Sequence, residues 1–154
     1  MAQIIISRHI NAPIEDIWES WDDFGEIAKF HPGIKGSHLI NGSARGGKGA
    51  DRQCNLSKDG KKFVRERVVS SIPNRQMVVD IYDGTVPLKR AQATLDFKQM
   101  GMTSTHVQMT MDFTPGMGIL GWLMTPMMKA QFKGMLKKVL ASNEAFVING
   151  TTVQ

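Results

Sequence analysis

The chain has 154 residues, of which 42% are hydrophobic and 21% charged, and this ordinary globular composition excludes a disordered chain. Its single cysteine, Cys54, excludes an internal disulfide and any zinc or iron–sulfur knuckle built from several cysteines. The net charge of +5 mildly favours an acidic ligand or partner, nucleic acid or an anionic surface, without choosing among them.

The length fits one hydrophobic core, so we expect a single domain over residues 1–148 followed by a tail over 149–154. The apolar stretch Ile4-Ile5-Ile6 is followed at once by Ser7-Arg8-His9, and it is too short for a signal peptide or a membrane span. We therefore expect a cytoplasmic protein without a transmembrane segment.

The first third of the chain predicts one strand and two short helices. A strand over 3–10 is broken by Asn11-Ala12-Pro13, which suits the start of a helix. The helix is indicated by apolar residues at the spacing of one helical face, namely Ile14, Ile17, Trp18 and Trp21. A second short helix over 24–30 ends at His31-Pro32-Gly33, because the residue before a proline disfavours helix.

Beyond this point the apolar period falls to two, which predicts an antiparallel sheet with short connections. One face of the sheet is expected to be buried and the other wet, because apolar and polar residues alternate most clearly in the last two strands. The predicted strands cover residues 34–40, 49–56, 62–70, 76–82, 89–98 and 104–113.

The C-terminal part of the chain predicts a long helix. Thr114-Pro115-Gly116 ends the sheet, a short Gly- and Met-rich helical stretch runs to Thr125, and Pro126 opens the longest helical pattern. The inner face of the sheet is the only apolar surface large enough to cover this helix, so the fold class is α+β, with a curved sheet wrapped around the helix. The apolar face of this predicted helix carries Met128, Phe132, Met135, Leu136, Val139 and Phe146.

Two charged residues interrupt the apolar side of neighbouring strands. Lys58-Asp59-Gly60 suits a three-residue hairpin loop, because Gly60 can adopt the left-handed conformation that such a loop needs. Counting back from this loop sets Arg52 directly opposite Glu66. Two interpretations stay open: an inward-facing pair that can offer hydrogen bonds to a ligand, or an exposed structural ion pair worth about 0–1 kcal/mol.

The element order and several short motifs resemble a known superfamily. One strand, two small helices, a run of strands and a long final helix resemble the helix-grip fold of the START-like superfamily, which includes birch-pollen-allergen-like proteins. The opening is similar to bacterial proteins of the polyketide cyclase/dehydrase family. Its matching residues are Asn11-Ala12-Pro13-Ile14-Glu15-Asp16-Ile17-Trp18, Asp23-Phe24-Gly25 and Lys29-Phe30-His31-Pro32, followed by Arg52, Glu66-Arg67 and Thr114-Pro115.

The resemblance implies a cavity between helix and sheet that holds an apolar small molecule, with Arg52, Glu66 and His31 as its polar residues. The competing interpretation of His31 is a turn or surface histidine. The resemblance also implies that Asp80 and Tyr82 point into the cavity. The alternation of this strand predicts instead that the apolar residues Met77, Val79 and Ile81 point inward.

Methionines on the predicted inner surfaces suit an adaptable cavity, although each one also suits ordinary core packing. The helix residues expected to contact a ligand are Met128, Phe132 and Met135.

Two functions are compatible with these residues. The first is binding of a hydrophobic or amphipathic small molecule in the cavity. The second is a polyketide cyclase or dehydrase that acts on a substrate delivered by an acidic carrier protein, with Glu66 or His31 as the acid or base. Neither of these two functions implies a cofactor. No cluster of residues has the spacing of metal ligands. The lysines lack the interleaved aromatic residues that are typical of a nucleic-acid site, so we expect no nucleic-acid partner.

Overall fold

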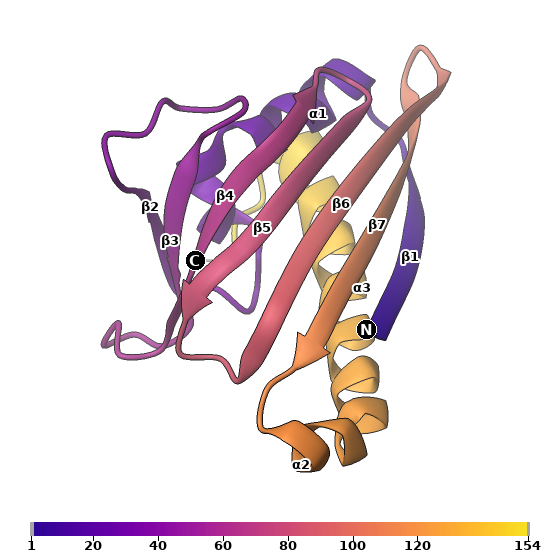
Figure 1. Cartoon of the computed structure of the whole chain (residues 1–154). Coiled ribbons are helices and arrows are strands. Elements are labelled where there is room, and N and C mark those ends of the chain that lie inside the picture. Colours follow the sequence, from indigo (N-terminus) through magenta and orange to yellow (C-terminus); the bar gives the residue numbers. More distant parts are fainter. Residues whose placement is uncertain (1, 154) are drawn as a thin grey trace.

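The computed structural model describes residues 2–153, which form one antiparallel sheet and a set of helices on its inner side (Figure 1). The sheet has seven strands in the order β1-β7-β6-β5-β4-β3-β2. The predicted α+β class is confirmed. The elements are β1 (Ala2–Ile10), α1 (Ile14–Asp22), the 3₁₀ helix η1 (Phe24–Lys29), β2 (Gly36–Leu39), β3 (Asp51–Asn55), β4 (Phe63–Ile72), β5 (Gln76–Gly84), β6 (Leu88–Gly101), β7 (Ser104–Pro115), α2 (Gly118–Leu123) and α3 (Thr125–Asn149).

The helix α3 lies along the inner face of the sheet, as its apolar face predicts (Figure 1). The buried apolar residues belong to one cluster that joins the inner faces of the strands to α1, η1 and α3. The α3 residues buried in this cluster are Leu136, Val139 and Leu140. The same periodicity that predicted α1 is seen in its burial, since Ile14, Ile17, Trp18 and Trp21 are all buried.

The strands β2 and β3 are shorter than alternation predicts. The segment between them is rich in glycine, and Gly47 and Gly49 have φ angles of 83° and 92°, a region that only glycine enters readily. The chain therefore turns there instead of continuing a strand from residue 49.

The C-terminal helix ends at Gly150, whose φ angle of 69° is typical of a left-handed helix cap. The tail that follows is held against η1, because the backbone N–H of Val153 donates to the carbonyl of Lys29 at 2.9 Å. Among residues 2–153, no helix is both long and apolar enough to cross a bilayer.

Candidate functional site

Arg52 on β3 and Glu66 on β4 face each other across the two strands, in the register that the hairpin loop predicts. Gly60 in that loop has a φ angle of 74°, the left-handed conformation expected of it. Arg52 Nε donates to Glu66 Oε1 at 2.8 Å, and the side chains are only 5% and 13% exposed. The interpretation as an exposed structural pair is therefore wrong.

The 3₁₀ helix η1 covers Arg52 from the inner side. The Arg52 guanidinium lies 3.8 Å from the centre of the Phe24 ring, and its Nη1 donates to the Phe24 carbonyl at 3.0 Å. The aromatic face and the carbonyl together replace part of the water that the guanidinium loses on burial. Strand alternation gave no signal for Phe24, because its contribution is a backbone carbonyl and a packing contact.

Glu66 is held as a carboxylate despite its burial. Burial by itself raises the pKa of Glu66, but the charge and hydrogen bond of Arg52, together with smaller contributions of Cys54 and His31, lower this pKa below its usual value. The Cys54 thiol donates to Glu66 Oε1 at 3.3 Å, and burial followed by the Glu66 charge raises the pKa of Cys54 well above its usual value. Cys54 is therefore a neutral donor in this site and not a nucleophile.

His31, which follows η1, lies close enough to the ion pair for both charges to act on it. The pKa of His31 is lowered to about 4, mainly by burial and in smaller part by the Arg52 charge, while the Glu66 charge partly opposes the change. His31 Nδ1 accepts a hydrogen bond from the Gly33 N–H at 3.1 Å, so the proton of the neutral ring is on Nε2. His31 is therefore not a simple surface histidine, but it is a turn histidine, because its carbonyl also accepts the Ile34 N–H at 3.1 Å.

The lowered pKa of His31 makes the stability depend on pH in a defined direction. Between about pH 4 and pH 6.5 the unfolded chain binds a proton at His31 that the folded chain does not. The free energy of unfolding therefore falls as the pH drops through this window. A tenfold change in proton affinity corresponds to about 1.4 kcal/mol, so the lowering of the His31 pKa from 6.5 to about 4 contributes at most about 3.5 kcal/mol to this fall.

Met135 of α3 closes the site from the helix side. A Cβ atom at Gly33 would stand 3.0 Å from Met135 Cε and 3.2 Å from His31 Cε1, so the absence of a side chain at residue 33 lets Met135 lie beside His31. Phe132 precedes Met135 by about one turn of α3, and its ring makes an edge contact with the ring of Phe113 at 5.0 Å between ring centres. Met128 also packs against the core, nearer the start of the helix.

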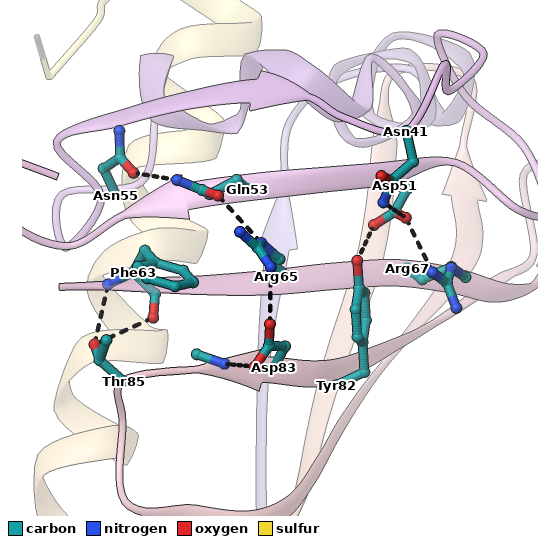
Figure 2. Close-up of polar contacts among 11 residues, drawn as sticks. Asn41, Asp51, Gln53, Asn55, Phe63, Arg65, Arg67, Tyr82, Asp83 and Thr85 are labelled. Carbon is teal, nitrogen blue, oxygen red and sulfur yellow. Dashed lines mark hydrogen bonds and ion pairs between the residues drawn. The ribbon is translucent and has the colours of Figure 1, made fainter. Parts of the chain in front are cut away.

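Asp80 and Tyr82 lie on the outer face of the sheet, and their predicted inward orientation is wrong. The Tyr82 hydroxyl donates to Asp51 Oδ1 at 2.7 Å, as Figure 2 shows, and Asp80 accepts a hydrogen bond from Gln92 at 2.7 Å. Met77 and Val79 are buried on the opposite side of β5, as a period of two requires. Alternation predicted this orientation, whereas the resemblance did not.

The outer face carries a polar cluster that the sequence patterns did not predict (Figure 2). Its centre is Asp51, which is only 3% exposed and also accepts hydrogen bonds from Asn41 at 2.9 Å and from Arg67 at 3.0 Å. Burial opposes the ionised form of Asp51, but these donors lower its pKa. The guanidinium of Arg67 lies 4.4 Å from the centre of the Tyr82 ring. Through these hydrogen bonds Asp51 joins β3 to β4, to β5 and to the turn before β3, which indicates a structural role.

The hollows on the surface of residues 2–153 include five with volumes of about 180 to 730 Å³. None of these five is lined by Arg52, Glu66 or His31. The largest of them lies among the ends of α1, β5, β6 and β7 and is lined by polar residues that include Arg75, Asp96 and His106. An enclosed cavity at the ion pair stays a prediction.

Comparisons with known proteins agree with this architecture. Residues 1–145 match the model of a family described as polyketide cyclase/dehydrase and lipid transport. A START superfamily protein from Mycobacterium smegmatis is 19% identical with a TM-score of 0.78, covering 97% of this chain and 99% of that one. The protein XoxI from Bacillus cereus is 20% identical with a TM-score of 0.77, covering 97% of each chain. No curated protein matches this chain. At these identities the likeness shows the fold, and the predicted helix-grip architecture is confirmed.

Proposed function

The chain belongs to the polyketide cyclase/dehydrase and lipid transport family, and we propose that it binds a hydrophobic or amphipathic small molecule between the sheet and α3. Family and fold support a ligand-binding domain. The observation that carries the proposal is the Arg52–Glu66 pair, an ion pair buried on an otherwise apolar inner face.

Stability alone does not account for such a pair. Apolar residues of similar volume commonly replace a buried ion pair without loss of stability, because the attraction only offsets the loss of hydration. Charged side chains that remain in this place are better explained by a polar group that they orient. The pair would hold the head of an amphipathic ligand and leave its apolar part to the neighbouring methionines.

The hydrogen bonds of the pair leave room for that polar head. Both hydrogen bonds that Glu66 accepts from the described residues are on Oε1, and Arg52 uses Nε and Nη1. Glu66 Oε2 and Arg52 Nη2 are thus available to a ligand group that both donates and accepts hydrogen bonds, such as a hydroxyl or a carboxylic acid.

The apolar part of the ligand would lie against α3. Met128, Phe132 and Met135 are partly buried, and a methionine side chain can adopt several shapes at low cost. We expect the ligand to displace Met135 from its place beside Gly33 and His31, which would open space for the ligand next to the ion pair.

Native mass spectrometry of the purified chain tests this function. We expect a copurified small molecule on the wild-type protein and its loss from the double variant Arg52→Leu with Glu66→Leu. The matched control is Arg65→Leu with Asp83→Leu, which removes an exposed Arg–carboxylate ion pair of 2.9 Å on the outer face. Equal retention by the two double variants would contradict the proposal.

The Nε2–H of His31 supports a second candidate function. The ring is neutral at pH 7 because its pKa is about 4, and its Nδ1 already accepts the Gly33 N–H. Nε2–H can therefore donate a hydrogen bond to a substrate carbonyl, while the Glu66 carboxylate accepts a proton from the substrate. This is the chemistry of a cyclase or dehydrase, and the net charge of +5 would suit an acidic carrier protein. Cyclisation of a carrier-bound poly-β-ketone by the wild type but not by His31→Gln would support it, and unchanged substrate with both would reject it.

A further inference from the structure

A group of large apolar side chains stands in solvent at the α2 end of the molecule. Ile119, Leu123 and Trp122 are 81%, 74% and 52% exposed, although apolar residues of this size are usually buried. In Figure 1, α2 and the start of α3 extend beyond the ends of the neighbouring strands. We call this group the apolar tip, and it comprises Met117, Ile119, Leu120, Trp122, Leu123 and Met127.

The apolar tip is held in this exposed position by packing on its other side. A Cβ atom at Gly121 would stand 1.9 Å from the Gly116 carbonyl oxygen, so α2 is pressed against the end of β7 by a contact that only glycine allows. The Gly116 N–H in turn donates to the Pro87 carbonyl at 2.9 Å. The exposed side chains therefore lie on the face of α2 that points away from the protein.

The surroundings of the apolar tip are basic. No acidic residue occurs between Asp112 and Glu144, and this stretch contains four lysines. Lys129 and Lys133 are exposed on α3 just after the tip. Lys89 and Arg90 are exposed at the start of β6, next to the Pro87 contact with β7. A projecting apolar group with a basic border is complementary to the surface of an anionic bilayer.

We propose that the apolar tip docks this protein on anionic phospholipid membranes, with its apolar side chains among the acyl chains and the basic residues at the headgroups. A bilayer fits better than a second protein surface, because the tip projects beyond the ends of the strands (Figure 1) and is bordered by exposed basic residues. Trp122 suits the boundary between headgroups and acyl chains. This inference goes beyond the proposed function and would stand if no small molecule were bound.

Sedimentation of the full chain with vesicles tests the proposal. We expect binding to phosphatidylcholine vesicles that contain about 30% phosphatidylglycerol, weaker binding to phosphatidylcholine alone, and a decrease as salt shortens the Debye length. Trp18 and Trp21 are buried, so a blue shift of tryptophan emission on vesicle addition reports on Trp122.

Two variants separate the apolar tip from the rest of the surface. Ile119→Glu with Leu123→Glu should lower the partition coefficient at least about tenfold, because two inserted side chains become charged. Met102→Glu makes the same kind of change at a side chain that is 88% exposed in the β6–β7 turn, and it should bind vesicles like the wild type. Lys129→Gln with Lys133→Gln should weaken binding to the anionic vesicles by about fivefold per lysine.

The proposal is overturned by either of two results. One is a failure of the test with vesicles: the wild type does not bind them, or the Ile119→Glu with Leu123→Glu variant binds them as well as the wild type does. The other is self-association of the wild type in sedimentation velocity that the same variant abolishes while vesicles are not bound, since this would assign the apolar tip to a second copy of the chain. Circular dichroism confirms that each variant is folded, which is expected because the changed side chains are exposed.

Discussion

Replacing Glu66 by alanine is expected to remove a large part of the stability of this protein. The substitution deletes the carboxylate that faces Arg52 and leaves a guanidinium on a residue that is only 4% exposed. Arg52 would keep its contact with the Phe24 ring and its hydrogen bond to the Phe24 carbonyl. It would lose the 2.8 Å ion pair.

The expected loss is about 3–5 kcal/mol, the range for removing one partner of a buried ion pair. We expect the loss of stability to be near the lower end of this range, because the Phe24 ring and the Phe24 carbonyl still interact with the Arg52 charge. The double variant Arg52→Leu with Glu66→Leu should recover most of the loss, since it leaves no buried charge.

Urea denaturation followed by circular dichroism measures these free energies, and the two single variants and the double variant form a mutant cycle. The matched control is Asp83→Ala, which removes the partner of Arg65 on the outer face. Those two side chains are 51% and 40% exposed, so the control should cost less than about 1 kcal/mol. A cost of less than about 1 kcal/mol for Glu66→Ala would refute the reasoning, as would a double variant no more stable than either single one.

Three further predictions concern other residues. His31→Gln should remove up to about 3.5 kcal/mol of the fall in unfolding free energy of the wild type between pH 6.5 and pH 4, and an identical pH dependence in both proteins would contradict the lowered pKa. Cys54 should react with an aromatic disulfide reagent at least about 100-fold more slowly in the native protein than in urea, because burial raises the pKa of its thiol. Asp51→Ala should cost about 2–3 kcal/mol in urea denaturation and leave ligand retention in native mass spectrometry unchanged, because Asp51 belongs to the outer face. Loss of the ligand from the Asp51→Ala variant would contradict this prediction, because it would show that the outer face of the sheet affects ligand binding.

Local features of the sequence were enough for the order of the elements and for one strand register. The helical spacing from Ile14 to Trp21 and the alternation of the strands are properties of short segments. The pairing of Arg52 with Glu66 followed from three loop residues, because a loop of known length with Gly60 in the left-handed conformation permits one register.

Orientation on β5 was also contained in the sequence, although it was in conflict with the resemblance. Met77 and Val79 point inward because apolar side chains of one parity gain most from burial, and Tyr82 then points outward to Asp51. A resemblance at fold level does not settle such an orientation. The bulge between β4 and β5 beside Glu66 shifts the pairing by one residue, and a shift of this kind changes the side of the sheet to which a side chain is assigned.

By itself, the sequence determined which residues form strands and helices and which charged residues face each other across β3 and β4, because these depend on neighbours along the chain. Only the tertiary structure decided how deeply they are buried. Arg52 is covered by Phe24, 28 residues away, and His31 lies beside Met135 of α3 and within reach of the charges of the ion pair. The exposure of the apolar tip was decided in the same way, since a short helical pattern does not reveal whether another element covers it. Burial depends on contacts between segments that are distant in the chain, and it sets the pKa of His31, the strength of the ion pair and the surface left for a membrane.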